Sequence, residues 1–350
     1  ILWLSSVKKL LSLYHENKNT ILICEQNCAE LALATEFFSE VIGVDLVRLN
    51  RDVTYRFRML RRIAHLGASV AIQPTYSRAF LTGDSLVRAS GAKLRIGFDG
   101  DLSNIRPWQK WISDHWYTKL VPASAFPMME LDRNSEFLRN LGAGDGNADL
   151  AVLPKLGELP ADRRIFDDYF VVFPGASSPT RRWPVESFAM VAGQIVDKYD
   201  VVPVICGGEV EQELADRLLC QIGDERGKNY VGKTSLPELV EIIRQARLVV
   251  SNETAAIHIA AAVSTPAVCI LGGGHYGRFM PYPDEISGVK PIPVVTEVDC
   301  FGCNWRCWFT DDLSGPYPCV EGISVDQVMS AVDLAMKKNS AFSDSKLSGH

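Results

Sequence analysis

The chain has 350 residues, of which 47 % are hydrophobic and 22 % are charged, a balance typical of a folded soluble enzyme rather than a disordered or fibrous chain. It is too long for one typical hydrophobic core, so we expect two domains. The formal net charge of −6 gives no global case for nucleic-acid binding, and no apolar run reaches the roughly 18 residues that a membrane span needs.

The cysteines indicate the compartment. There are nine, an odd number, and Cys24, Cys206 and Cys269 fall on predicted strands, which fits a reducing cytoplasm better than a disulfide framework. The opening stretch, ILWLSSVKKLLSLYHENK, is amphipathic and lacks the layout of a signal peptide. Because the first residue is Ile1 rather than methionine, we expect the natural start of the chain to lie upstream.

The first half alternates predicted strands with predicted helices. Residues 2–16 have a broadly helical spacing of apolar side chains. Strands are predicted over residues 20–24, 44–49, 69–73 and 94–98, and helices over residues 28–41, 54–66 and 79–89. This rhythm predicts a parallel sheet that is covered by helices on both faces.

Two features of this half allow more than one interpretation. Residues 48–62 form the most basic run of the chain, which is either a solvated helix face or a contact surface for an anionic membrane or acceptor. A group of aromatic residues forms either a small satellite core or a platform for an acceptor: Trp108, Trp111, Trp116 and Tyr117.

The middle of the chain, residues 142–164, is rich in Gly, Pro, Asp and Ala, which is typical of a linker. We expect an N-terminal domain over residues 1–145, a linker over 146–166, a C-terminal domain over 167–338 and a frayed tail over 339–350. In the C-terminal domain, strands are predicted over residues 169–173, 201–206 and 230–231, and helices over residues 185–199, 211–221 and 237–245.

Residues 248–274 predict a βαβ unit around which the domain is organised. A buried strand leads through a polar turn into a helix that starts at Ala255, and a second buried strand ends in three glycines. The N-terminus of such a helix suits an anion such as a phosphate, and Glu253 and His258 are predicted to lie at its mouth. The alternatives are that Thr254 and its neighbours only cap the helix, and that His258 is a satisfied, partly buried histidine.

Two further strand-to-helix connections carry candidate ligand groups. Residues 173–184 offer Gly175 for a close backbone approach, hydroxyl groups that include Ser177, and Arg181 and Arg182 for pairing with phosphate oxygens. The alternative is a long loop with two surface arginines. After the next strand, Glu211 either accepts hydrogen bonds from ribose hydroxyls or complements a helix dipole.

One glycine pattern and one cysteine pattern also suggest binding sites. Residues 272–277 satisfy G-x-G-x-x-G, but prolines follow instead of a helix, so we predict a loop that passes close to a bound group rather than a dinucleotide fingerprint. Four cysteines have a spacing that can hold a structural zinc ion, with free thiols or an oxidation-dependent disulfide as the alternatives: Cys300, Cys303, Cys307 and Cys319.

Taken together, five motifs in this order resemble the heptosyltransferases of glycosyltransferase family 9: PGASSPTRRWP, GGEVE, GKTSLPEL, SNETAAIHIAAA and CFGCNWRC…PC. The resemblance covers roughly residues 165–330, while the first half matches only in its rhythm. It implies an α/β GT-B fold, in which two Rossmann-like parallel-sheet domains face each other across a cleft. It also implies transfer of heptose from ADP-heptose to the inner core of lipopolysaccharide, with inversion and without a catalytic metal.

By position, the resemblance implies a set of donor-binding residues: Ser177, Arg181, Glu211, Glu253, Thr254, Ala255 and His258. Arg181 stands where the family usually has a lysine that contacts the donor phosphates, and Glu253 and Ala255 replace the usual aspartate and glycine. Glu211 matches the carboxylate that holds the ribose. The family's general base is an aspartate in an opening glycine-rich turn, which we expect to lie before Ile1, so we assign no catalytic base.

The sequence thus predicts an inverting, metal-independent glycosyltransferase that needs no cofactor. Its expected partners are a nucleotide-sugar donor, ADP-heptose above all, and a lipid-linked or glycan acceptor, but no nucleic acid. We expect a cytoplasmic location with peripheral contact to the inner membrane. The alternatives are a nucleotide-sugar epimerase of similar build and a catalytically dead sugar-nucleotide binding protein.

Overall fold

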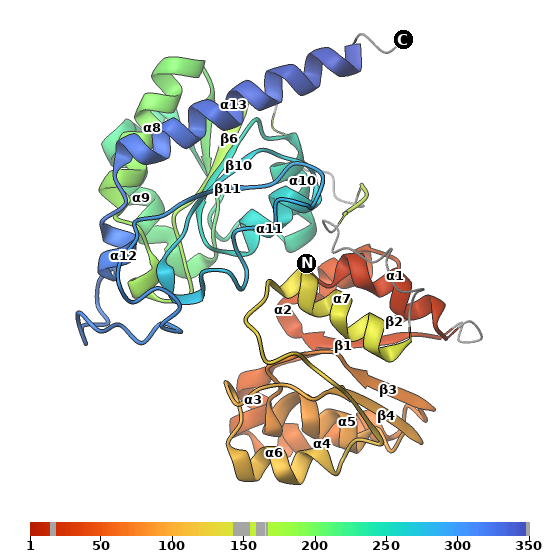
Figure 1. The fold of residues 1–350 in the computed structure, drawn as a ribbon. Coiled ribbons are helices and arrows are strands. Elements are labelled where there is room, and N and C mark those ends of the chain that lie inside the picture. Colours follow the sequence, from red (N-terminus) through yellow and green to blue (C-terminus); the bar gives the residue numbers. More distant parts are fainter. Residues whose placement is uncertain (15–18, 143–154, 159–164, 166, 348–350) are drawn as a thin grey trace. The chain divides into compact units, whose positions relative to one another are not determined.

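The structure is a computed structural model that describes residues 1–14, 19–142, 155–158, 165 and 167–347. The chain divides into two compact units, which can be followed by colour in Figure 1. Residues 6–151 make up the N-terminal unit, and residues 152–350 with residues 1–5 make up the C-terminal unit. The change between units falls inside the predicted linker, most of which lies outside the described residues.

The described strands of the N-terminal unit form two small parallel sheets. In one, β1 (Ile21–Glu25) pairs with β2 (Glu40–Val44); in the other, β4 (Leu94–Phe98) lies between β3 (Val70–Gln73) and β5 (Lys119–Val121). The helices of this part of the chain are α1 (Leu4–Ser12), α2 (Gln26–Ala34), α3 (Leu46–Arg51), α4 (Val53–Ala64), the π-helical turn η1 (Phe80–Asp84), α5 (Ser85–Ala89), α6 (Pro107–Asp114) and α7 (Glu130–Leu141). Strands and helices alternate as predicted, but in two sheets instead of one.

The strand predicted over residues 44–49 is wrong. β2 already ends at Val44, and α3 follows. The reason is Asp45, whose side chain accepts a hydrogen bond from the Arg48 amide at 2.9 Å and so caps the first turn of α3. The apolar run therefore serves first a strand and then a helix, and hydrophobicity alone does not separate the two.

The C-terminal unit contains one six-stranded parallel sheet. Its strands are β6 (Tyr169–Phe173), β7 (Val202–Ile205), β8 (Lys228–Asn229), β9 (Val249–Asn252), β10 (Ala267–Ile270) and β11 (Ile292–Val294). They lie in the order β8-β7-β6-β9-β10-β11, so the order reverses between β6 and β9. This is the doubly wound arrangement of dinucleotide-binding folds.

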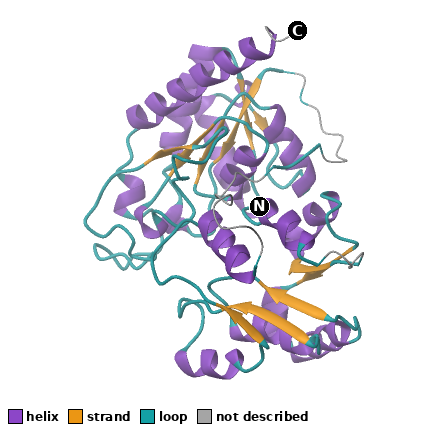
Figure 2. Cartoon of the chain, turned by 45° about the vertical axis from the view of Figure 1, so that its right-hand side comes forward, coloured by secondary structure: helices purple, strands orange, loops and turns teal. Residues whose placement is uncertain are grey.

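Helices cover both faces of this sheet, as Figures 1 and 2 show. The helices are α8 (Val185–Tyr199), α9 (Gln212–Ile222), α10 (Leu236–Gln245), α11 (Ala255–Ala262), α12 (Pro318–Glu321) and α13 (Val325–Leu347), with a short turn η5 (Gly273–His275) after β10. α8 packs against α9 and α13, and α10 packs against α11. The predicted frayed tail from residue 339 is wrong up to Leu347, because α13 continues that far.

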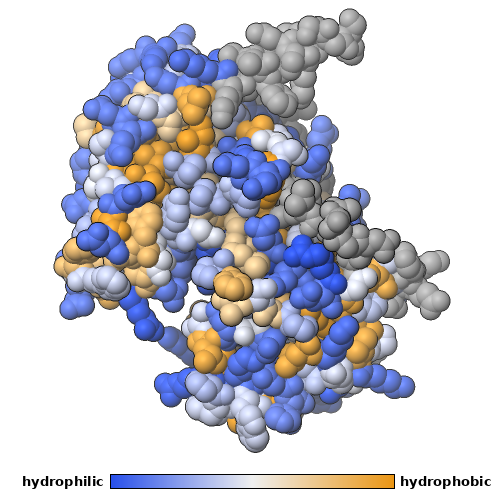
Figure 3. Space-filling model, viewed as in Figure 1, coloured by the Kyte–Doolittle hydropathy of each residue, from blue (hydrophilic) through white to orange (hydrophobic). Residues whose placement is uncertain are grey.

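Burial explains why the central strands have no alternation of apolar and polar residues. Every residue of β9 and β10 is buried, because a parallel strand between two helical layers has no wet face. The described helices include none that is both long and apolar enough to cross a membrane. On the face shown in Figure 3, hydrophobic side chains lie interspersed with hydrophilic ones.

Candidate functional site

The candidate site lies at the carboxyl ends of β6 and β9, where the strand order reverses. In open parallel sheets, ligands bind at this point because the connections on its two sides lead away in opposite directions. Two segments leave the sheet here: the β6 loop, which we define as residues 174–184, and the β9 turn, Glu253 and Thr254, which leads into α11.

Asn252 joins these two segments. Its side chain is completely buried, and Oδ1 accepts a hydrogen bond from the Trp183 amide at 3.0 Å. Nδ2 donates to the carbonyl oxygens of Pro174 and Gly175, at 2.8 and 3.2 Å. The sequence suggested that Asn252 belongs to a helix cap, but the structure shows that it fixes both ends of the β6 loop to β9.

Arg181 and Glu253 meet across this junction. The Arg181 guanidinium lies 3.2 Å from Glu253 Oε2 and also donates to the Ser177 hydroxyl at 3.3 Å. Glu253 is only 8 % exposed. Burial raises the pKa of its carboxyl group, while the Arg181 cation lowers it. The structure therefore brings three of the predicted residues together around one cation.

Thr254 and Ala255 form the start of α11. The Thr254 hydroxyl accepts a hydrogen bond from the Ala256 amide at 3.3 Å, so Thr254 is the helix cap that the sequence suggested. Ala255 is the first helical residue and is exposed. The first amides of α11 thus lie directly after the Glu253 backbone, where they add positive potential to that of Arg181.

Arg182 and Glu211 have structural partners that the sequence did not indicate. Arg182 donates through Nε and an Nη atom to the Ala176 carbonyl oxygen, at 3.1 and 3.0 Å, so it stabilises its own loop instead of facing a phosphate. Glu211 is buried and accepts from the Gly208 amide at 2.8 Å, and burial raises the pKa of its carboxyl. Its carboxylate occupies the space beside Gly175, where a Cβ atom would collide with it.

His258 lies on α11 against Tyr282. Its Nδ1 is 2.8 Å from the Tyr282 hydroxyl, and the two rings stack with centroids 5.9 Å apart. Burial lowers the pKa of His258 to about 4, so the imidazole is neutral at pH 7. These contacts agree with the alternative prediction that His258 is a satisfied, partly buried histidine.

The glycines after β10 accommodate aromatic side chains that the sequence did not indicate, whereas the predicted close approach to a bound group stays a prediction. We call residues 300–307 the strap. Its Phe301 ring lies where a side chain on Gly273 would be, and its Trp305 ring covers Gly272 and Gly274. The strap is held there by backbone hydrogen bonds from Gly302 and Asn304 to the turn η5, at 2.8 and 2.9 Å.

The model of one family, described as glycosyltransferase family 9 (heptosyltransferase), matches residues 84–294, which is more than half of the chain. The chain belongs to glycosyltransferase family 9. The match begins well before residue 165, so the first half resembles the family more closely than its rhythm alone suggested.

Individual relatives within glycosyltransferase family 9 are distant. Lipopolysaccharide heptosyltransferase 2 of Escherichia coli is 32 % identical over 104 residues, which is 28 % of this chain and 29 % of that protein. Lipopolysaccharide heptosyltransferase 3 of Escherichia coli is 28 % identical over 231 residues, 61 % of this chain and 64 % of that protein. The chain thus aligns with less than two thirds of the length of either relative.

A solved structure of another protein is similar to this chain in fold. It is the structure of E. coli heptosyltransferase WaaC with ADP-2-deoxy-2-fluoro heptose, and the two align over 95 % of this chain and 95 % of that chain, with a TM-score of 0.65 and 16 % sequence identity. At this identity the likeness shows the fold alone. The predicted α/β GT-B fold with parallel sheets is therefore confirmed.

The positions of the four cysteines Cys300, Cys303, Cys307 and Cys319 in the structure do not support the predicted zinc site. All four cysteines are described and none forms a disulfide. Among the described residues, no group of three or more His, Cys, Asp or Glu side chains lies close enough to hold a metal ion. The Cys303 amide donates to the Cys300 carbonyl oxygen at 3.1 Å, and burial raises the pKa of the Cys300 thiol.

The N-terminal unit contains a buried ionic network that sequence reasoning missed. Arg78 is 1 % exposed, pairs with Asp114 and lies 3.8 Å from Asp84, which is completely buried. The Tyr117 hydroxyl donates to Asp84 at 2.7 Å. These residues come from separate segments that only the fold brings together, so no local pattern could have revealed them.

The tryptophans of the N-terminal unit differ in their packing. Trp116 stacks on Phe80 with ring centroids 4.9 Å apart, and Trp108 packs edge-on against the same ring at 5.9 Å, as in a satellite core. Trp108 and Trp111, on α6, are nevertheless 54 % and 69 % exposed.

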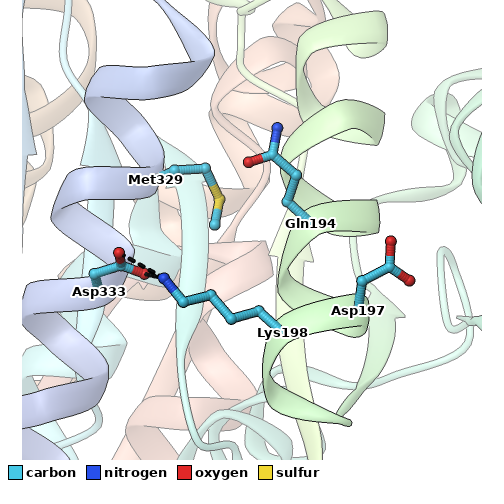
Figure 4. Close-up of a pocket in the computed structure, with 5 residues that line it drawn as sticks. All are labelled: Gln194, Asp197, Lys198, Met329 and Asp333. Atoms are coloured by element: carbon cyan, nitrogen blue, oxygen red, sulfur yellow. Dashed lines mark hydrogen bonds and ion pairs between the residues drawn. The ribbon is translucent and has the colours of Figure 1, made fainter.

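A shallow depression on the C-terminal unit lies away from the candidate site. It has a volume of about 430 Å³ and lies between α8 and α13 (Figure 4). Lys198 and Asp333 form an ion pair of 2.8 Å across it, and both side chains remain partly exposed. Such a surface pair is worth little in free energy and offers no reacting group, so we assign the depression no function.

Proposed function

We propose that this family 9 member transfers a heptose or a related sugar from a nucleotide-diphosphate sugar to a lipopolysaccharide core or related glycan acceptor. We take the donor as ADP-heptose, the transfer as inverting and the chemistry as metal-independent. The observation that carries the proposal is the cluster of Ser177, Arg181 and Glu253 at the reversal of the strand order. The names of the relatives, both lipopolysaccharide heptosyltransferases, support it.

The proposed reaction requires the site to stabilise negative charge. In an inverting transfer, an acceptor hydroxyl oxygen attacks the anomeric carbon from the face opposite the diphosphate. The carbon–oxygen bond to the phosphate breaks, and its electron pair stays on the leaving nucleoside diphosphate. Arg181 and the first amides of α11 offset this charge, and preorganised positive groups of this kind are usually the largest contribution to catalysis. A base takes the proton of the hydroxyl, and we assign it to no residue.

The other predicted residues have consistent places in this proposal. A donor phosphate competes with Glu253 for Arg181, since the carboxylate holds the guanidinium at 3.2 Å. The buried carboxylate of Glu211 accepts from the ribose hydroxyls. His258 Nδ1 lies 2.8 Å from the Tyr282 hydroxyl. We propose the tautomer in which Nδ1 accepts from this hydroxyl and the proton on Nε2 donates to the ligand as an uncharged group.

The test has two stages. The first is calorimetric titration of the protein with ADP, UDP and GDP, in which we expect ADP to bind most tightly. The second is incubation with ADP-heptose and heptose-deficient lipopolysaccharide, followed by mass spectrometry of the glycolipid. A mass increase of one heptose supports the proposal. Donor binding without transfer would favour a binding protein, and conversion of the free donor to an epimer would favour an epimerase.

We further propose that the N-terminal unit contacts the membrane that carries the lipid-linked acceptor. Val53, Phe57 and Arg61 are spaced four residues apart on α4, which places them on one stripe, and all three are exposed. The turn η1 contacts both α3 and α6, and α6 carries the exposed Trp108 and Trp111. Aromatic side chains beside arginines suit an anionic lipid surface.

Sedimentation with lipid vesicles tests this contact. The protein should pellet with vesicles that contain anionic phospholipid, and less so with neutral vesicles or at high salt. Trp111→Ala should weaken the binding, whereas Trp308→Ala, a change at an exposed tryptophan of the C-terminal unit, should not. Equal pelleting of both variants with the parent protein would contradict the assignment.

A further inference from the structure

Besides Glu253 Oε1, three buried polar atoms of the site have no hydrogen-bond partner among the described residues: Arg181 Nε, His275 Nδ1 and Trp305 Nε1. They belong to the β6 loop, the turn η5 and the strap. Buried polar atoms in native proteins are nearly always paired, so a group of unpaired ones calls for an explanation. The proposed function does not use His275 or Trp305.

The three side chains lie against one another. The Arg181 guanidinium lies over the Trp305 ring, 4.7 Å from its centre. The His275 ring packs edge-on against the same indole, with centroids 5.8 Å apart. Arg181 is also held by Glu253, a residue of the candidate site. Trp305 and His275 therefore line the same site from the side of β10.

The backbone of the strap is held in a strained form at this point. Asn304 and Trp305 have φ angles of 54° and 61°, in the left-handed region that residues other than glycine rarely adopt. The Asn304 amide donates to the Gly274 carbonyl at 2.9 Å, which helps to keep the pair in place. Such strain persists only where surrounding contacts over-determine it, and it concentrates at ligand sites.

The unpaired atoms specify the chemistry of the missing partner. Arg181 Nε and Trp305 Nε1 are donors, so they need acceptor oxygens such as those of a phosphate. His275 Nε2 donates to Asn304 Oδ1 at 2.8 Å, so Nδ1 of the neutral ring carries a lone pair and needs a donor such as a hydroxyl. A ligand that carries both phosphate oxygens and hydroxyl groups satisfies all three atoms, whereas a fully ionised phosphate satisfies only two.

We propose that the strap and the turn η5 form a further wall of the donor site, in which the Trp305 indole nitrogen donates a hydrogen bond to a diphosphate oxygen of the nucleotide sugar. The Trp305 ring at the same time holds the Arg181 guanidinium by a cation–π contact. This inference rests on the proposed function, because it takes the ligand to be a nucleotide-diphosphate sugar. It adds Trp305 to the phosphate-binding residues and gives the glycines of the turn their purpose.

Calorimetry with ADP and adenosine tests the hydrogen bond. Trp305→Phe keeps an aromatic ring under Arg181 but removes the N–H group. We expect it to weaken ADP binding about 10- to 100-fold, the range for a hydrogen bond to a charged group, and to leave adenosine binding unchanged. Trp308→Phe, three residues further along the chain and 74 % exposed, is the matched control and should bind both ligands like the parent.

The outcomes separate the two levels of the proposal. A parent protein that binds ADP, together with a folded Trp305→Phe variant that binds it equally well, overturns the role of the strap alone. A parent protein that binds none of ADP, UDP and GDP overturns the proposed function and with it the strap. Should Trp305→Phe fail to fold, benzothienylalanine at position 305 retains the indole shape without the N–H group and gives the same test.

Discussion

Replacement of Asn252 by alanine removes the side chain that joins the two halves of the site. Three hydrogen bonds are lost, and the Trp183 amide is left buried without its acceptor. One unsatisfied buried group costs about 1–3 kcal/mol, so with the cavity we expect a loss of about 2–4 kcal/mol in the free energy of unfolding. Because the β6 loop is then free to move, ADP binding should weaken as well.

Denaturant unfolding followed by tryptophan fluorescence measures the first effect, since Trp183 is buried in the C-terminal unit. Gln194→Ala, a change of a side-chain amide on the surface depression, is the control and should stay within about 0.5 kcal/mol of the parent. If Asn252→Ala has the stability and the ADP affinity of the parent, Asn252 does not hold the loops.

Asn252→Asp sharpens the same experiment. The aspartate retains an acceptor for the Trp183 amide, but its second oxygen faces the carbonyl oxygens of Pro174 and Gly175. Burial and these carbonyls disfavour the charged form, so the pKa of this aspartate should lie above its usual value. The loss of stability relative to the parent should then be smallest in acid and grow as the pH rises from the usual aspartate pKa to that raised pKa. A pH-independent difference from the parent would contradict this reasoning.

Four further predictions follow from the site. Arg181→Ala should weaken ADP binding by about 1.5–3 kcal/mol and Arg181→Lys by much less, because lysine retains the charge; calorimetry compares them. Gly175→Ala should push the Glu211 carboxylate aside and cost about 1–3 kcal/mol of stability, whereas Gly208→Ala, with no atom near its added Cβ, should not. The pKa of His258, about 4, lies below the usual 6.5, so the unfolded state binds the extra proton and the parent should lose stability as the pH falls from 6.5 towards 4; His258→Asn should lose less. Elemental analysis should find no bound metal at the four cysteines of the strap region, and one metal ion per chain would restore the zinc hypothesis.

The second half of the fold was predictable because its strands are buried on both faces. The strand predicted over residues 169–173 coincides with β6, and the apolar runs around β9 and β10 needed no alternation to be recognised. The boundaries in the first half were harder, since one apolar run continues from β2 through Asp45 into α3. Only the cap at Asp45 divides it, and a single polar residue is a weak signal.

The candidate site was predictable in its residues but not in its contacts. Ser177, Arg181 and Glu253 were chosen from connections that follow separate strands, and the fold brings them together because β6 and β9 are neighbours. The true partners of Gly274 and Arg182 could not be read from the sequence. Gly274 is covered by Trp305, about 30 residues further along the chain, and no local rule specifies such a contact.

The bonds of Asn252 also determine when the site can form. They join residues that are 69 to 78 positions apart in the chain, so they cannot appear before β6 and β9 have paired. Contacts of such long sequence separation form slowly, because the intervening chain must be ordered first. A partly folded C-terminal unit that contains α8, α9 and their strands but lacks the pairing with β9 would have no assembled loop to hold a diphosphate. Under the proposed function, nucleotide binding is therefore a measure of completed folding of the C-terminal unit, and a newly made chain should gain it only after β9 has paired.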